Sequence, residues 1–106
     1  MSDYIVVLIT TSTREEGEKI VSTLVDEKLA ACGNIIEGLT SIFFWEEKIC
    51  KETEALLMIK TKKSLFERLS ARVKEIHSYD VPEVIALPVT AGSEEYLDWV
   101  KKSTER

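Results

Sequence analysis

The sequence predicts an α+β domain whose strands and helices follow the order β-α-β-β-α-β, with a short helix at the end. Four runs of consecutive or alternating apolar residues have the β-branched and aromatic composition typical of strands. Between them, apolar residues recur at intervals of three and four, which indicates helices. A length of 106 residues suits one hydrophobic core, so we expect residues 1–106 to form a single domain.

The chain is expected to begin with a buried strand and an amphipathic helix. Residues Tyr4–Ile9 are continuously apolar, as in a central strand that is buried on both faces. The helix should begin near residue 13, because Ser12 with Glu15, or Thr13 with Glu16, has the spacing of a capping box. Its apolar stripe is formed by Ile20, Val21, Leu24, Val25 and Leu29.

A long β-hairpin is predicted between residues 30 and 61. A polar break at residues 46–48 separates its two arms, although the break contains no Gly or Asn to define the turn type. Gly33 and Gly38 interrupt the first arm and indicate a bulge or a bend there.

Both faces of this hairpin are predicted to be apolar. Residues 42–45 (Ile-Phe-Phe-Trp) and 56–59 (Leu-Leu-Met-Ile) are apolar at consecutive positions, whereas a sheet with one solvated face alternates. Helices can cover only one face, and exposing the other would forfeit several kcal/mol at about 25 cal/mol per Å². We infer that the open face packs on other copies of the chain, with a hydrophobic ligand or a local twist as the alternative.

A second helix is predicted after the hairpin. Ser64 and Glu67 have the spacing of another capping box, and the helical period continues as far as Ile76. The helix should end near His77, because Pro82 disfavours helical geometry at the residue before it.

The last predicted elements are a strand and a short helix. The strand covers Val84–Val89, and Pro88 favours an edge position or a strand end. Ser93 should cap the helix, whose inward residues are expected to be Tyr96, Trp99 and Val100. With its helices on one face of an antiparallel sheet, this order is the ferredoxin-like arrangement.

Composition and charge restrict the partners and the compartment. Apolar residues make up 44% and charged residues 31%, and the net charge of −5 disfavours a nucleic-acid partner. No apolar run approaches the roughly 20 residues that span a bilayer, and the one at the N-terminus is too short for a signal peptide. The cysteines Cys32 and Cys50 form no disulfide framework, so we expect a cytoplasmic protein without a membrane association.

The residues that could carry chemistry are few. The glycine-rich loops of nucleotide-binding proteins are absent, and Cys50 is interpreted as an incidental surface thiol. His77 could activate Cys32 as a nucleophile, but no spacing places the two together. The connection His77–Glu83 gathers an imidazole, a phenol and two carboxylates, so it is a candidate site, with a hydrogen-bonded turn as the alternative.

Several stretches together resemble the CutA family of divalent-cation tolerance proteins. They are Leu29–Asn34, the hairpin arm ending in Phe44-Trp45, Lys60-Thr61, the connection His77–Glu83 and the closing Tyr96–Trp99 segment. The resemblance covers nearly the whole chain. It implies a ferredoxin-like subunit in a tight homotrimer, similar in architecture to the nitrogen-regulatory PII signalling proteins.

The resemblance also implies a function. It indicates a trimeric protein that binds divalent metal ions, with copper the usual ion, takes part in the response to metal ions and is not an enzyme. The candidate metal ligands that it implies are Cys32 and His77, and the candidates for lining a cleft between subunits are Trp45, Lys60, Tyr79 and Glu83. Because one chain offers too few soft ligands for a closed site, we add Glu83 to the candidate metal ligands. Thiolate and imidazole suit copper better than calcium or magnesium.

The sequence departs from the family pattern in two places. Ser78 and Asp80 stand where the family commonly has proline and glutamate, and the turn after Trp45 lacks the common glycine. Two other functions stay open. One is a PII-like sensor that binds a small metabolite between subunits with the help of Lys60, and the other is a trimeric scaffold that presents partners.

Overall fold

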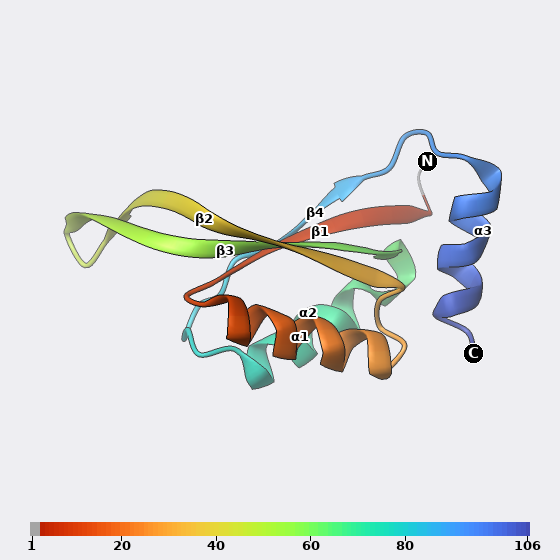
Figure 1. Ribbon diagram of the computed structural model, residues 1–106, viewed down its shortest axis with the longest axis horizontal. Coiled ribbons are helices and arrows are strands. Elements are labelled where there is room, and N and C mark those ends of the chain that lie inside the picture. The colour runs from red at the N-terminus through yellow and green to blue at the C-terminus, as the bar shows by residue number, and fades with distance from the viewer. Residues whose placement is uncertain (1–2) are drawn as a thin grey trace.

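The computed structural model describes residues 3–106 and contains a four-stranded antiparallel sheet with three α-helices (Figure 1). Its elements in chain order are β1 (Tyr4–Thr11), α1 (Arg14–Asp26), β2 (Cys32–Trp45), β3 (Lys48–Lys62), a 3₁₀ turn (Lys63–Leu65), α2 (Phe66–Ile76), β4 (Val84–Pro88) and α3 (Glu94–Ser103). The strands lie in the order β2-β3-β1-β4, and each neighbouring pair is antiparallel. The predicted ferredoxin-like fold is therefore confirmed.

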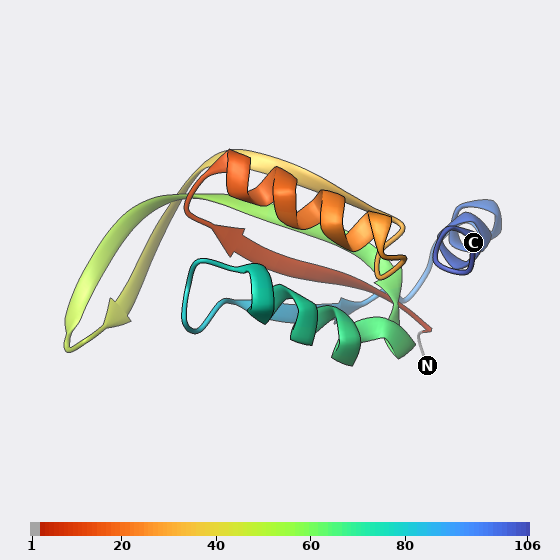
Figure 2. The ribbon, with the colours of Figure 1, turned by 90° about the horizontal axis from the view of Figure 1, so that it is seen from below.

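The core lies between the sheet and the two helices α1 and α2, which cover the same face (Figure 2). Fully buried side chains from both layers meet there: Val7, Ile9, Leu57 and Ile59 from the strands, and Ile20, Leu24, Leu69 and Val73 from the helices. Because strand side chains alternate between faces, Val6 and Leu8 lie on the other side and are only partly buried. Within this chain, β1 is therefore covered on one face only, contrary to the prediction of a strand buried on both.

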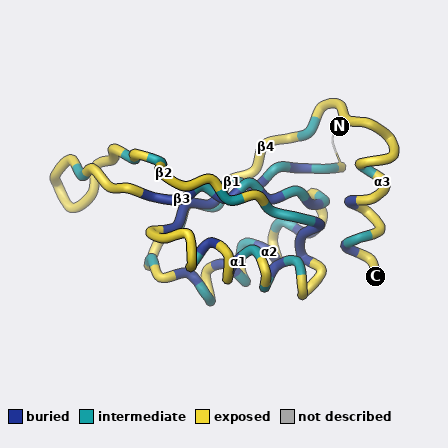
Figure 3. Tube along the Cα trace, in the orientation of Figure 1, coloured by how far each residue is buried: buried dark blue, intermediate teal, exposed yellow. Residues whose placement is uncertain are grey.

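Helices α1 and α2 leave the opposite face of the sheet open, and α3 reaches only one end of it, where Val6 and Tyr96 line the same small cavity. Leu8 lies opposite Met58 of β3 and opposite Ile85 of β4, and Val6 lies opposite Leu87. We call the side of the sheet formed by these five residues the open face. Much of β4 and of the hairpin is exposed (Figure 3), and large apolar side chains of these strands are in contact with solvent: Ile36, Ile42, Phe43, Phe44, Trp45, Ile49, Ile85 and Leu87. The structure thus contains the apolar surface that the sequence predicts.

The start of α1 follows one of the two predicted caps. Thr13 has an extended backbone, and its hydroxyl accepts a hydrogen bond from the Glu16 amide at 3.1 Å. The start of α2 does not follow the prediction, because Ser64 lies inside the 3₁₀ turn and caps nothing. The residue with the extended backbone that a cap requires is Lys62, so Ser64 comes too late to serve.

Helix α3 is capped as predicted but oriented differently. The Ser93 hydroxyl oxygen accepts a hydrogen bond from the Tyr96 amide at 3.3 Å. Of the three residues expected to face inward, only Val100 is buried, whereas Tyr96 and Trp99 are 43% and 44% exposed. The reason is the position of α3, which packs at one end of the sheet rather than across a face (Figures 1 and 2), so only a narrow stripe of it meets the domain.

The β2–β3 hairpin extends well beyond the rest of the sheet and curves as it does so (Figure 2). Its pairing shifts between Ile36 and Leu39, and Gly38 occupies the irregularity with a φ of +76°, which confirms the predicted bulge at this glycine. Gly33 has another role. It stays in register opposite Ile59, where an added Cβ would lie 2.7 Å from the Ile59 Cδ1 atom.

The tip of the hairpin is a two-residue turn made by glutamates. Glu46 and Glu47 have φ values of 49° and 64°, between the paired residues Trp45 and Lys48. Such turns favour Asn-Gly, because the left-handed region costs other residues about 1 kcal/mol each. We expect the double substitution Glu46→Asn with Glu47→Gly to raise the free energy of unfolding by about 1 kcal/mol, measured by denaturant titration at one protein concentration.

A matched control separates backbone strain from charge. The pair Glu46→Gln with Glu47→Gln removes the same two charges but retains side chains that disfavour positive φ. This pair should leave the denaturant concentration at the unfolding midpoint nearly unchanged. Equal stabilisation by both pairs would show that charge repulsion, not the turn conformation, limits stability here.

Within the part of the chain that the structure describes, none of the helices combines the length and the apolar character that crossing a membrane requires.

Candidate functional site

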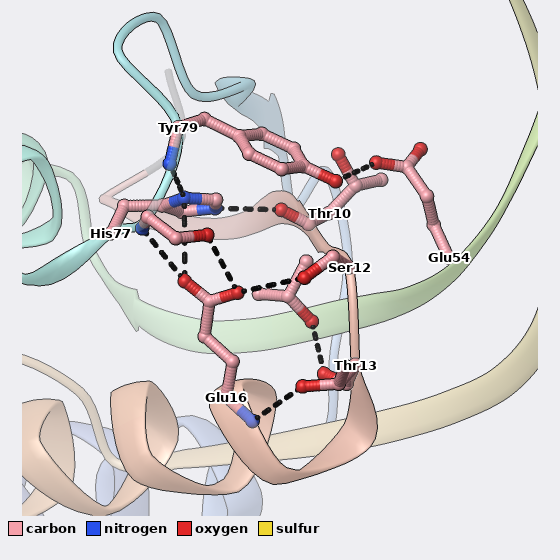
Figure 4. A network of polar contacts seen from close by, with 9 residues as sticks. Thr10, Ser12, Thr13, Glu16, Glu54, His77 and Tyr79 are labelled. Atoms are coloured by element: carbon pink, nitrogen blue, oxygen red, sulfur yellow. Dashed lines mark hydrogen bonds and ion pairs between the residues drawn. The ribbon is translucent and has the colours of Figure 1, made fainter.

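A network of polar contacts ties the connection after α2 to the start of α1 and the end of β1 (Figure 4). At its centre, the His77 side chain is completely buried. Its Nε2 atom lies 2.8 Å from the Thr10 carbonyl oxygen, and its Nδ1 atom accepts from the Tyr79 amide at 3.0 Å. Because a carbonyl only accepts and an amide only donates, these contacts fit a neutral ring protonated at Nε2. Both ring nitrogens are thus engaged within the chain.

Glu16 anchors the same connection from α1. Its carboxylate accepts from the Ser78 amide at 2.8 Å and from the Ser78 hydroxyl at 3.0 Å, and it lies 3.6 Å from Nδ1 of His77. Burial alone would raise the pKa of Glu16, but the hydrogen bonds from Ser78 and Ser12 and the electrostatic effect of the His77 ring together lower the pKa below 4.5. The network therefore contributes stability above about pH 4.5, and this contribution is lost as the pH falls through the folded pKa of Glu16.

Tyr79 joins the connection to the hairpin. Its hydroxyl donates to Glu54 of β3 at 2.6 Å, and its ring lies 4.6 Å from the His77 ring between centroids. Burial, and then the hydrogen bond and charge of Glu54, raise the pKa of Tyr79 above its ordinary value. The phenol therefore stays protonated at neutral pH and acts as a donor. Glu54 itself is only 8% exposed.

Next to this network lies a cavity of about 590 Å³. Strands β1 and β2 contribute Thr10, Ser41, Ile42, Phe43 and Trp45. Strand β3 contributes Cys50, Glu52 and Glu54, and the connection after α2 contributes Tyr79, Asp80, Val81 and Glu83. Four of these lining residues carry carboxylates and none carries a lysine or arginine side chain, so the cavity attracts cations.

The structure brings together three of the six residues that the resemblance singles out. Trp45, Tyr79 and Glu83 line the cavity. His77 is not among the lining residues and is covered by its contacts with Thr10 and Tyr79.

The other two lie at the opposite end of the hairpin. Cys32 begins β2 and pairs in register with Lys60, whose ammonium group donates to Asn34. The Cys32 sulfur lies 3.5 Å from the Tyr96 hydroxyl, a contact that with burial raises the pKa of Tyr96 to about 12. Lys60 and Tyr96 also line a smaller cavity of about 240 Å³.

Within the described residues of this chain, no closed metal site is observed. Among residues 3–106, no three His, Cys, Asp or Glu side chains lie close enough together to hold a metal ion. Cys32, His77 and Glu83 therefore do not form a site in a single chain, and any site that uses them needs donors from outside it.

Sequence reasoning missed several cavity residues. Cys50, interpreted as a surface thiol, is partly buried in the cavity wall together with Glu52 and Glu54. These three occupy alternate positions of β3 and so share one face of the strand. The alternation was readable from the sequence, but the approach of the connection after α2 to that face was not.

Comparisons with known proteins agree with one another. The family model described as "CutA1 divalent ion tolerance protein" matches residues 5–103. The chain is 53% identical over 94% of its length to the protein CutA, chloroplastic, of Arabidopsis thaliana, and 48% identical over 93% to the divalent-cation tolerance protein CutA of Thermus thermophilus. It spans 55% of the Arabidopsis protein and 56% of a similar rice protein, against 96% of the Thermus protein.

Solved structures show the same fold. The divalent cation tolerance protein Cut A1 of Thermus thermophilus superposes with a TM-score of 0.92 at 46% identity, covering 94% of this chain and 97% of that one. The structure titled periplasmic divalent cation tolerance protein CutA of Archaeoglobus fulgidus gives 0.93 at 38% identity, covering 95% and 98%.

Proposed function

The chain belongs to the CutA1 divalent ion tolerance family, and from that premise we propose that it is a divalent-cation tolerance protein that binds copper as a homotrimer. Its relatives are named for tolerance of divalent cations rather than for a reaction, so we expect no catalytic activity. The plant relatives are named chloroplastic and one solved relative is titled periplasmic. For this chain we propose the cytoplasm, where its two free cysteines would stay reduced.

The observation that carries the proposal is the open face. Leu8, Met58 and Ile85 pair in register across three strands without a covering helix. Ile85 and Leu87 are 51% and 50% exposed in the single chain, and exposed apolar side chains continue along the hairpin. Burying such a surface between identical subunits is the common solution, and three copies would also supply the metal donors that one chain lacks.

Copper is the ion that the candidate ligands favour. Among first-row divalent ions it binds most strongly, and it accepts thiolate, imidazole and carboxylate. Cys32 and Glu83 are the more available candidates, since His77 can coordinate only by releasing Thr10 or Tyr79. A site built from these residues would join donors of neighbouring subunits.

We expect copper binding to depend on these ligands. Calorimetric titration of Cu²⁺ into the assembled protein should give saturable binding, and the Kd should rise at least tenfold in Cys32→Ala or Glu83→Gln. Glu37→Gln is the matched control, because Glu37 is exposed and outside the cavity but its loss changes the net charge equally.

Two results would contradict this ligand assignment. Unchanged affinity in both variants would remove Cys32 and Glu83 as ligands. An equal loss in Glu37→Gln would mean that the acidic surface attracts copper without a defined site. Assembly should be checked in every variant by light scattering, so that loss of binding is not confused with loss of the trimer.

A further inference from the structure

Helix α3 is packed loosely against the rest of the domain. Val100 is its one buried residue, and the main core beneath the sheet contains no residue of α3. The cavity of about 240 Å³ lies along the helix and is lined there by Tyr96, Leu97 and Val100. Because side chains next to such a space lack close partners on one side, the docked position of α3 is only weakly stabilised.

The polar contacts that hold this end of the chain lie near the surface. The Lys62 ammonium group is 2.9 Å from the Glu105 carboxylate, and the Arg106 guanidinium donates to the Val25 carbonyl at 2.8 Å. Surface ion pairs of this kind contribute little to stability. Residues 90–92 (Thr-Ala-Gly), which lead into α3, belong to no helix or strand and can turn without disrupting one. The helix is therefore placed to undock as a unit.

The docked helix contacts a residue that the proposed function uses. Cys32 lies opposite Lys60, and Lys60 lies opposite Val6, so these three side chains share one side of the sheet. It is the side on which α3 lies, since Lys60, Val6 and Tyr96 line the small cavity together. The Cys32 sulfur is partly buried and lies 3.5 Å from the Tyr96 hydroxyl. Helix α3 thus occupies an approach to this sulfur.

We propose that α3 is a latch over Cys32, and that copper reaches the sulfur when the helix undocks about residues 90–92. This regulation rests on the proposed function, in which Cys32 is a copper ligand. Undocking exposes Val100 and separates Tyr96 from Cys32, while the core beneath α1 and α2 stays packed because α3 contributes nothing to it. Local opening of such a terminal element requires much less free energy than global unfolding.

The test measures how fast dithiobis(nitrobenzoate) modifies the Cys32 thiol in the assembled, metal-free protein. The chain has two cysteines, so the Cys50→Ser background leaves Cys32 as the single thiol. When the helix redocks faster than the reagent reacts, the modification rate is proportional to the undocked fraction. Light scattering checks the assembly of each variant at the concentration used.

We expect slow modification in the background protein and a rate about tenfold higher in Val100→Ala, which truncates the buried side chain of α3. Leu97→Ala weakens the same docking contact from a second position and should also raise the rate. Val73→Ala is the matched control, because it makes the same truncation at a position of α2 that is 0% exposed in the main core. It should leave the rate within twofold.

Three results would overturn the latch. A background rate equal to that of a small free thiol would mean that the docked helix covers nothing. Equal acceleration by Val73→Ala would mean that Cys32 is exposed by global unfolding. Slow and equal rates in all the variants would mean that another part of the assembly shields the sulfur.

Copper binding distinguishes a failure of the latch from a failure of the proposed function. In the same background, Val100→Ala should bind Cu²⁺ faster by the same factor as it reacts with the thiol reagent. Thiol rates that contradict the latch, together with weaker copper binding in Cys32→Ala, would overturn the latch alone. Thiol rates as expected, with unchanged copper affinity in Cys32→Ala, would overturn the ligand assignment and the role of the latch in metal binding, but not the undocking of α3.

Discussion

Replacing Ile85 by Asp should convert the assembled protein into monomers that retain their secondary structure. Ile85 lies on the edge strand β4, opposite Leu8, and is 51% exposed in the single chain. A carboxylate at a half-exposed position costs a free subunit little. Buried without a partner between subunits, the same charge costs several kcal/mol, which is enough to abolish assembly at micromolar concentration.

The measurement is the mass in solution. Wild-type protein should sediment at three times the 12.0 kDa of the chain, and the Ile85→Asp variant at that mass itself, with an unchanged far-ultraviolet circular dichroism spectrum. A dilute wild-type protein that is folded and monomeric would contradict the trimer, and so would a variant that still sediments as the wild type does.

Two further substitutions locate the effect on the open face. Ser22→Asp adds the same charge to the exposed side of α1 and should leave the trimer intact. Leu57→Asp places the charge on the opposite face of the sheet, where Leu57 is 0% exposed beneath the helices. That variant should unfold the subunit, so its spectrum, unlike that of Ile85→Asp, should lose its native form.

The element order could be predicted because each element carries its own local signal. The capping oxygens of Thr13 and Ser93, the run of apolar residues in β3 and the proline at the end of β4 all act over a few residues. Local signals gave a wrong prediction where the conformation of the preceding segment determines where a helix begins. Ser64 has the right spacing for a cap, but the chain leaves β3 through a 3₁₀ turn that places it inside the turn.

The candidate site was less predictable because it depends on contacts between distant segments. The apolar stripe of α3 is visible in the sequence, but not the surface that it meets, so Trp99 was expected inside and lies half-exposed. The pairing of Tyr79 with Glu54 joins positions 25 residues apart, and no spacing rule indicates it. For His77, the sequence shows an imidazole in a polar connection, which is equally consistent with a ligand and with a buried hydrogen-bonding residue.

The second large effect concerns His77, whose replacement by Ala should lower the free energy of unfolding by about 3 kcal/mol. The change removes both ring nitrogens from a side chain that is 0% exposed. It leaves the Thr10 carbonyl and the Tyr79 amide without these hydrogen-bond partners. Each of these groups that stays buried then costs about 1–3 kcal/mol of stability. It also opens a void beneath the Tyr79 ring. Denaturant titration at a fixed protein concentration measures the loss.

Two conservative variants separate the two hydrogen bonds. The amide nitrogen of Gln can take the place of Nε2 and donate to the Thr10 carbonyl, while the amide oxygen of Asn can take the place of Nδ1 and accept from Tyr79. Each should recover part of the stability that His77→Ala loses. If both variants are as unstable as His77→Ala, packing of the ring against Tyr79 is the main contribution. If His77→Ala is as stable as wild type, the polar network does not hold the connection, and the ring is free to serve the copper site instead.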